Sequence, residues 1–247
     1  MIRNNEFVLY GKIEMSDFKK EWNKSYSQGD NNILYPQAEV IKFLNRFVCK
    51  RNNDGTLTRY LNKQKTQKLR GLDFGCGIGT HAIIFNDFQI DAYGIDLSEV
   101  AISKAIENAT KKGINRDQFL VQSGDTHKLP YEDNYFDFVV AESCLDSMPF
   151  SLSKLYISEL KRITNGIIYA SLIGHDPSMT SEEFVVKTQH EKGTIQTVFD
   201  EEKICNLFGI SKEKFIYFSC INQTNCNSKT LTGKRYYVIA KCSDTEV

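Results

Sequence analysis

Residues 71–80, Gly-Leu-Asp-Phe-Gly-Cys-Gly-Ile-Gly-Thr, constrain the fold more than any other stretch of this chain. Leu72 to Phe74 are predicted to end a buried strand, and glycines at 75, 77 and 79 precede a helical pattern. Glycine tolerates positive φ angles and has no side chain, so a ligand can lie on the backbone of such a turn, whose N–H groups we expect to point outward. Asp73 adds a carboxylate, which suits a cationic or amine-bearing group better than a phosphate. The stretch therefore predicts a ligand site where a strand turns into a helix.

A dinucleotide-binding turn is the first alternative. That motif has the spacing G-x-G-x-x-G, whereas Thr80 stands here in place of the third glycine and Gly79 comes one residue early. The spacing counts against a nicotinamide-dependent oxidoreductase, which stays open as an alternative enzyme function.

Composition limits the function classes. The length of 247 residues suits one integrated α/β domain, in which 1–66 is expected to form an N-terminal helical lid and connector and 67–247 the core. The 31 basic and 31 acidic residues balance, so we expect no nucleic-acid or membrane partner. No signal-peptide pattern or membrane-spanning apolar run is present, which predicts a cytoplasmic protein. The Asn, Lys and Ile content is typical of AT-rich bacterial genomes.

Cysteine usage predicts neither disulfides nor a metal site. The seven cysteines are irregularly spaced and form no C-x-x-C pair, and an odd count does not close a disulfide framework. We expect reduced, buried thiols.

Strand and helix patterns alternate along the core. Strands are predicted at 69–74, 90–95, 118–123, 136–141 and 166–172, with helices at 78–88, 98–112 and 151–163. Such alternation implies right-handed crossovers and a parallel sheet covered on both faces. An extended stretch at 193–198 and a helix at 200–208 follow. Two final strands, near 214–221 and 234–242, have no helix between them and are predicted to pair antiparallel.

Two amphipathic helices are predicted before the core, at 16–28 and from Pro36 onward. Trp22 and Tyr26 on the first are assigned to core packing. Residues 51–68 are polar and basic and are interpreted as an exposed connector. Its cations form a solvated face or, alternatively, meet an anionic substrate; they are Arg59, Lys63, Lys65, Lys68 and Arg70.

Acidic residues follow the predicted strands in order. Asp96 comes after the second strand, Asp125 with Thr126 after the third, and Glu142 after the fourth. Ligands of open parallel sheets bind at the carboxyl ends of strands, where one carboxylate can accept both hydroxyls of a ribose. Each residue also has a structural explanation, since Asp96 would suit a helix N-terminus and Asp125 a loop cap.

On the Leu-Asp-Phe-Gly-Cys-Gly-Ile-Gly run and these strand-end residues, the chain resembles a class I S-adenosylmethionine-dependent methyltransferase of the small-molecule type, over about residues 69–172. The resemblance implies a Rossmann-like three-layer α/β sandwich. Its seven-stranded, mostly parallel sheet has the order 3-2-1-4-5-7-6 with the last strand antiparallel. An N-terminal helical lid is also implied.

The resemblance further implies S-adenosyl-L-methionine as the cofactor. Asp96 would bind the ribose, Leu97 would pack on the adenine, and Asp125 with Thr126 would read its edge. Glu142 would lie near the methionine, and Tyr35 would contact the cleft from the lid. The residues implied to cradle the methionine moiety are Asp73, Gly75, Cys76, Gly77 and Gly79.

The sequence says least about which molecule accepts the methyl group. A hydroxyl acceptor needs a base, and the histidine candidates are His175, His190 and His127, whereas His81 is expected to line the pocket or cap its helix. The segment with Trp22, Tyr26 and Leu34-Tyr35-Pro36 is similar to that of methyltransferases of bacterial surface-polysaccharide and secondary-metabolite pathways. It favours O-methylation of a sugar, a nucleotide-linked intermediate or another small polar molecule, by a monomer or homodimer.

Two further alternatives remain. A nucleic-acid methyltransferase is disfavoured because the fourth strand ends Ala-Glu-Ser-Cys, without an Asn-Pro-Pro-Tyr-like loop, and no proline precedes Cys144. A non-catalytic cofactor-binding subunit stays open because no catalytic residue is identified with certainty.

Overall fold

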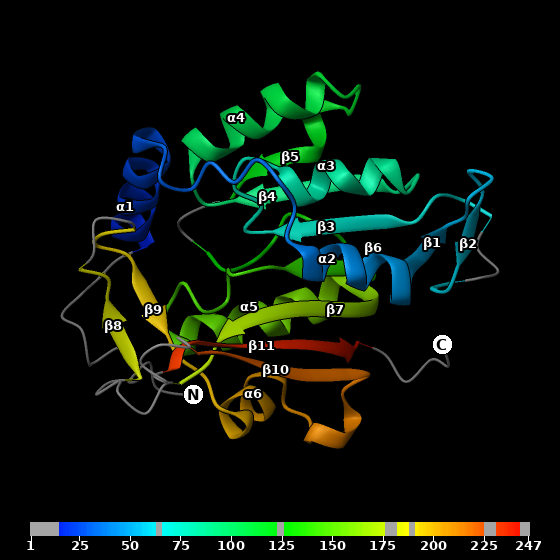
Figure 1. Cartoon of the computed structure of the whole chain (residues 1–247). Helices are drawn as coiled ribbons and strands as arrows, with labels where there is room; N and C mark the ends of the chain where they lie inside the picture. The colour runs from blue at the N-terminus through cyan, green and yellow to red at the C-terminus, as the bar shows by residue number, and fades with distance from the viewer. Residues whose placement is uncertain are drawn as a thin grey trace.

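The structure is a computed structural model, which describes residues 15–62, 66–122, 126–175, 182–187, 191–224 and 231–242. Within these ranges a seven-stranded sheet forms the centre of the molecule (Figure 1). Its strands are β3 (Arg70–Phe74), β4 (Asp91–Asp96), β5 (Phe119–Val121), β6 (Phe136–Ala141), β7 (Thr164–Ile173), β10 (Tyr217–Thr224) and β11 (Leu231–Lys241).

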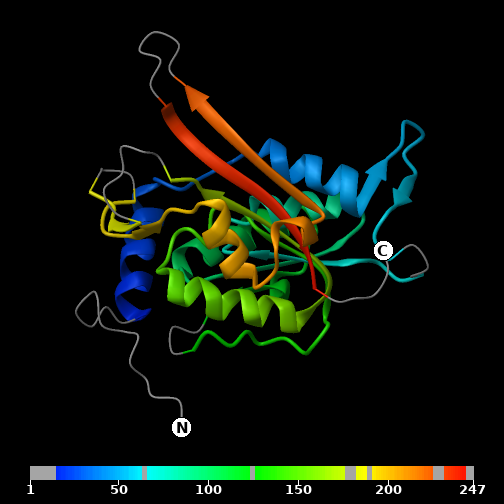
Figure 2. The same cartoon turned by 90° about the horizontal axis from the view of Figure 1, so that it is seen from below.

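The strand order is β5-β4-β3-β6-β7-β11-β10. The pairs among β3 to β7 are parallel, whereas β11 runs antiparallel to both β7 and β10. Counted along the chain, this is the order 3-2-1-4-5-7-6, so the predicted topology is confirmed. The β10–β11 hairpin projects beyond the rest of the sheet (Figure 2).

Helices cover both faces of the sheet and make the predicted three layers (Figure 1). One face carries α2 (Ala38–Phe43, continued by a π-helix over Leu44–Val48), α3 (Thr80–Asp87) and α4 (Glu99–Thr110); the other carries α5 (Phe150–Ile163) and α6 (Glu201–Phe208). Short 3₁₀ helices cover Arg116–Gln118 and Lys212–Lys214. Successive strand residues point to opposite faces, so Phe138 and Val139 of β6 enter the two different cores.

The predicted connector at 51–68 contains part of a hairpin. β1 (Cys49–Arg51) and β2 (Leu57–Arg59) pair antiparallel across a turn at 52–55. Cys49 and Leu61 are buried in the same core as α2, so this segment is held against the domain. Within the predicted connector at 51–68, the expectation of exposure is therefore wrong at Leu61, whereas the other described residues are exposed or half-buried. The boundary between residues 66 and 67 stays a prediction.

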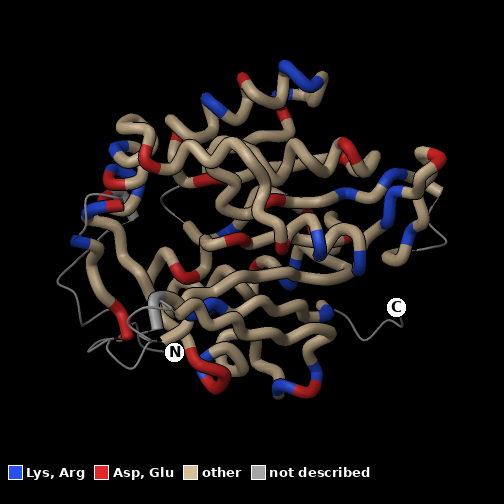
Figure 3. The backbone as a smooth tube through the Cα atoms, viewed as in Figure 1, with Lys and Arg blue, Asp and Glu red and all other residues tan. Residues whose placement is uncertain are grey.

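Lys and Arg gather around β1, β2 and the start of β3 (Figure 3). Arg59 donates to a backbone carbonyl at 2.8 Å, Lys68 lies 3.7 Å from an aspartate, and the Arg70 guanidinium lies 4.4 Å from the centre of a tyrosine ring. Lys63 and Lys65 lie outside the described residues. These intramolecular contacts favour the solvated-face interpretation.

The helix α1 (Met15–Gln28) stands beside a second hairpin, β8 (Glu183–Val185) and β9 (Ile195–Thr197) (Figures 1 and 2). The two touch closely, since a Cβ on Gly193 would lie 2.6 Å from Glu21 Oε2. None of the helices in the described ranges combines the length and apolar character needed to cross a membrane.

Phe138→Ala tests how far the core holds the site's scaffold together. The ring is fully buried and packs against Phe43 of α2 and Phe85 of α3, at centroid distances of 5.8 and 5.1 Å. We expect the free energy of unfolding to fall by about 3–5 kcal/mol in urea denaturation. The control Tyr35→Ala, at a side chain that is 83% exposed, should change it by less than about 0.5 kcal/mol. Equal effects would contradict this description of the core.

Candidate functional site

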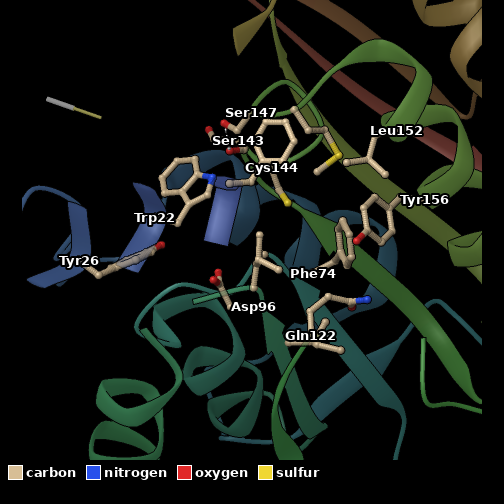
Figure 4. Close-up of a pocket in the computed structure, with 15 residues that line it drawn as sticks. Trp22, Tyr26, Phe74, Asp96, Gln122, Ser143, Cys144, Ser147, Leu152 and Tyr156 are labelled. Carbon is tan, nitrogen blue, oxygen red and sulfur yellow. Dashed lines mark hydrogen bonds between the residues drawn. The ribbon is translucent and has the colours of Figure 1, made fainter. Parts of the chain in front are cut away.

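A pocket opens at the carboxyl ends of β3 and β4, against α1 (Figure 4). It measures about 680 Å³ with its solvent-open mouth included. Its walls come from α1, the ends of β3 and β4, the residue after β5, and the segment from the loop after β6 into α5. The lining residues are Phe18, Trp22, Tyr26, Phe74, Gly75, Ile95, Asp96, Leu97, Gln122, Ser143, Cys144, Ser147, Met148, Leu152 and Tyr156.

The N–H groups of the glycine turn bond within the protein. The Ile95 carbonyl accepts the N–H groups of Gly75 and Cys76 at 2.8 and 3.0 Å. The Gly77 N–H donates to Asp96 Oδ2 at 2.9 Å. The expectation that these groups point outward is therefore wrong: they fasten the turn to the end of β4. A pyrophosphate would need them as donors, so the turn does not fit a dinucleotide.

Glycine is required in the turn for two close approaches. Gly75 and Gly77 have φ angles of 72° and 53°. A Cβ on Gly75 would lie 2.3 Å from Cys144 Sγ, and one on Gly77 would lie 2.6 Å from Tyr26 Oη. The missing side chains let the loop after β6 and α1 close on the turn from two sides.

Asp96 is the carboxylate that faces the pocket. Oδ2 accepts the Gly77 N–H, and Oδ1 accepts the Ser98 N–H at 2.8 Å. The side chain is fixed in orientation while each oxygen keeps a lone pair for another donor. Burial raises the pKa of Asp96 to about 6, against the opposing effect of these N–H bonds. Asp96 is therefore ionised at neutral pH and can accept hydrogen bonds from hydroxyl groups.

Asp73 points into the protein, toward the first turn of α3. Its Oδ2 accepts the Ala82 N–H at 3.2 Å and lies 3.9 Å from His81 Nδ1. Burial raises the pKa of Asp73 to about 6 and lowers that of His81. His81 Nε2 accepts the backbone N–H of Gln37, so this histidine fastens the segment between α1 and α2. Asp73 acts on the pocket by charge, not by lining it.

Glu142 also lies behind the pocket wall. Its Oε2 accepts the Tyr169 hydroxyl at 2.8 Å, and burial raises its pKa. The next residue, Ser143, does line the pocket, with a positive φ of 52° that is unusual for a residue with a side chain. The Arg235 guanidinium, from the last strand, donates to Ser143 Oγ at 3.0 Å and to the fully buried Asp146 at 3.3 Å. The C-terminal strand thereby fixes this loop, which sequence reasoning did not find.

The predicted adenine-reading segment is only partly described. Leu97 lines the pocket as expected. Asp125 lies outside the described residues, and the Thr126 side chain is exposed. The buried Gln122 lines the pocket and donates to the Thr126 carbonyl at 3.0 Å. Sequence reasoning missed Gln122 because the strand predicted at 118–123 included it, whereas β5 ends at Val121.

The N-terminal segment contributes aromatic side chains to the pocket, but Tyr35, the residue predicted for this role, is not among the described ones. Tyr35 is 83% exposed and is absent from the described lining. Trp22 and Tyr26, which were assigned to core packing, do pack in a hydrophobic cluster with Ile78, Val100 and Ala101, and they line the pocket as well. They lie four residues apart on α1, and Figure 4 shows both at the side of the pocket that α1 forms. Burial, followed by the nearby Asp96 charge, raises the pKa of the Tyr26 phenol.

Neither His127 nor His175 is among the described residues that line the pocket. His127 is exposed, and His175 is half-buried with its backbone N–H bonded to Phe199. His190 lies outside the described residues, and its neighbour Glu191 is close enough to affect the Tyr26 phenol electrostatically. In the described part of the chain, no group of three His, Cys, Asp or Glu side chains is arranged to hold a metal ion.

Comparison with known proteins was made by sequence and by fold. The family model of a methyltransferase domain matches residues 65–236. An uncharacterised Haemophilus influenzae protein is 30% identical over 159 residues, which are 60% of this chain and 63% of that protein. The sterol 24-C-methyltransferase erg6 of Schizosaccharomyces pombe is 36% identical over 73 residues, 29% of this chain and 19% of that enzyme. The chain thus spans less than two thirds of the length of each of these relatives.

Solved structures share the fold. A methyltransferase from Methanosarcina mazei superimposes with a TM-score of 0.56 at 22% identity, over 72% of this chain and 93% of that one. The 1,6-didemethyltoxoflavin N1-methyltransferase of Burkholderia thailandensis gives a TM-score of 0.62 at 12% identity, over 93% and 88% of the two chains.

The buried carboxyl group of Asp73 should make stability depend on pH. Folding raises its pKa from 3.8 to about 6, so the folded chain keeps a proton that the unfolded chain releases in this window, and ionisation lowers stability as pH rises. Asp73→Asn removes this penalty and keeps an acceptor for Ala82. We expect the variant to gain about 1–3 kcal/mol relative to the wild type between about pH 4 and pH 7, in urea denaturation. A pH-independent difference, as expected for the exposed control Asp87→Asn, would contradict the assignment.

Proposed function

The chain belongs to the methyltransferase-domain family of S-adenosylmethionine-dependent enzymes, and from that premise we propose that it methylates a hydroxyl group of a small polar molecule, such as a sugar or a nucleotide-linked intermediate. The observation that carries the cofactor part of the proposal is Asp96. It is a pocket-facing carboxylate, oriented by two backbone N–H groups, at the place where a ribose would offer two hydroxyl donors.

The remaining residues suit S-adenosylmethionine. Leu97 and Gln122 offer an apolar surface and an amide for an adenine, and the bare backbone of Gly75 allows a ligand to lie against it. Asp73 and Glu142 are further carboxyl groups near the pocket, and burial raises the pKa of both. A cofactor with a sulfonium and an ammonium group is favoured there, whereas a pyrophosphate is repelled.

The bound cofactor supplies a methyl group already activated on its sulfonium. The protein therefore has to align the acceptor and exclude water. Trp22 and Tyr26 serve the second purpose in this proposal, since α1 carries both against the pocket. The loop held by Arg235 presents Ser143 and Ser147 to the pocket, where they can orient a polar acceptor.

A hydroxyl acceptor is proposed on the resemblance of the segment with Trp22, Tyr26 and Tyr35, and a base has to take its proton. The named enzymes methylate different atoms: a sterol carbon in one case and N1 of 1,6-didemethyltoxoflavin in another. Of the three histidines, His175 is proposed first, because it comes just after the end of β7. His190 and His127 remain the alternatives.

Cofactor selectivity tests the first part of the proposal. Calorimetric titration should show binding of S-adenosylmethionine and S-adenosylhomocysteine but not of NAD. Asp96→Ala should weaken binding about 10- to 100-fold, because hydrogen bonds to a charged acceptor are lost. The exposed control Asp117→Ala should bind like the wild type. Tight NAD binding would overturn the assignment.

Methyl transfer tests the second part. Incubation with methyl-labelled cofactor and extracts of small molecules should give a labelled product whose linkage, by mass spectrometry and NMR, is a methyl ether. Alanine variants of His190, His175 and His127 should leave cofactor affinity unchanged, and the variant that removes the base should lower kcat by about 100-fold or more. A labelled amine product would refute hydroxyl methylation, and transfer to no fraction would favour a non-catalytic cofactor-binding subunit.

A further inference from the structure

The helix α1 is fastened to the core at the first turn of α4. The N-cap residue of α4 is Ser98, which is fully buried. Its Oγ accepts the Ala101 N–H at 3.1 Å and donates its own proton to Asn23 Oδ1 on α1, at 2.7 Å. Asn23 Oδ1 also accepts the Val100 N–H at 3.4 Å. One side-chain oxygen of α1 thus satisfies two donors at the α4 N-terminus.

The same serine touches the pocket carboxylate. The Ser98 backbone N–H donates to Asp96 Oδ1, so a single residue bonds to α1 through its side chain and to Asp96 through its backbone. Trp22 lies next to Asn23 in sequence and lines the pocket. The helix wall of the pocket and its carboxylate are therefore connected through Ser98.

Trp22 and Tyr26 also share a hydrophobic cluster with Val100 and Ala101 of α4, and two lysines add polar contacts between the helices. Lys19 pairs with Glu99, whose side chain is 62% exposed, and such surface pairs contribute little. Lys104 donates to the Tyr26 carbonyl, which has a second donor in the Gly29 N–H. By contrast, a buried hydroxyl donor that loses its acceptor carries a full desolvation penalty unless water reaches it.

We propose that Asn23 is a positioning residue that couples the closure of α1 over the pocket to the orientation of Asp96. The coupling rests on the proposed function, in which Asp96 holds the cofactor. Without the Asn23 oxygen, Ser98 finds a new acceptor only when water enters between α1 and α4, which moves Trp22 and Tyr26 away from the pocket. The population with α1 closed falls, and apparent cofactor affinity falls by the same factor.

The test uses three variants of the full chain. Asn23→Leu removes the acceptor, Asn23→Asp keeps an oxygen at the same position, and Asn45→Leu is the matched control, because Asn45 bonds only to the Ile41 carbonyl within its own helix among its recorded contacts. Trp22 is the single tryptophan of the sequence, so its fluorescence reports on α1 without labelling. Calorimetric titration with S-adenosylhomocysteine gives the affinity, and thermal melting by circular dichroism confirms folding.

We expect Asn23→Leu to bind S-adenosylhomocysteine about tenfold more weakly. In the ligand-free protein its Trp22 emission should shift to longer wavelength and be quenched more readily by acrylamide. Asn23→Asp should restore both readouts to within about twofold of the wild type, which a role in side-chain packing alone would not require. Asn45→Leu should change neither.

Two results would overturn the inference. In the first, Asn23→Leu matches the wild type in affinity and emission; in the second, Asn23→Asp loses as much as Asn23→Leu. A wild-type chain that does not bind S-adenosylhomocysteine would instead overturn the proposed function, and the emission of the free variants would still decide whether Asn23 holds α1 closed.

Discussion

The hydrogen bond from the Gly77 N–H to the Asp96 carboxylate holds together the two strand ends on which the pocket is built. It joins the turn after β3 to the end of β4 and leaves Asp96 with one orientation. Ser98 fixes the second oxygen of the same carboxylate. Charge-assisted bonds of this kind contribute about 1.5–3 kcal/mol each, which offsets the burial that raises the pKa of Asp96. The carboxylate is thus oriented before any ligand arrives.

Much of the fold could be predicted because its signals are local. Alternating strand and helix patterns gave the parallel core, and the absence of a helix between the last two strands gave the antiparallel hairpin. Serine is a favoured N-cap residue, and Ser98, at the start of the helix predicted over 98–112, does accept the Ala101 N–H. The β1–β2 hairpin could not be predicted, because its hold on the domain comes from Cys49 and Leu61, which reach the core only in three dimensions.

The site was less accessible, because a residue's position after a strand does not say where its side chain points. Asp96 and Leu97 line the pocket, whereas Asp73, which lies within β3, is not among its described lining residues and accepts a hydrogen bond from the first turn of α3. Trp22 and Tyr26 have the spacing of a helix face, which is the same for a helix that packs on a core and for one that covers a pocket. In this chain both descriptions hold, because the two side chains pack with Val100 and Ala101 and also line the pocket.

The buried carboxyl groups of Asp73, Asp96 and Glu142 also affect the release of the cofactor after methyl transfer. Asp96 lines the pocket, and a ligand that carries positive charge stabilises the ionised form of these carboxyl groups, whose pKa values burial raises. In the proposed reaction the sulfonium becomes a neutral thioether, so the demethylated cofactor has one positive charge fewer than S-adenosylmethionine. The negative charges then attract S-adenosylhomocysteine less strongly than S-adenosylmethionine. Methyl transfer itself therefore lowers the electrostatic part of the affinity for the molecule that has to dissociate.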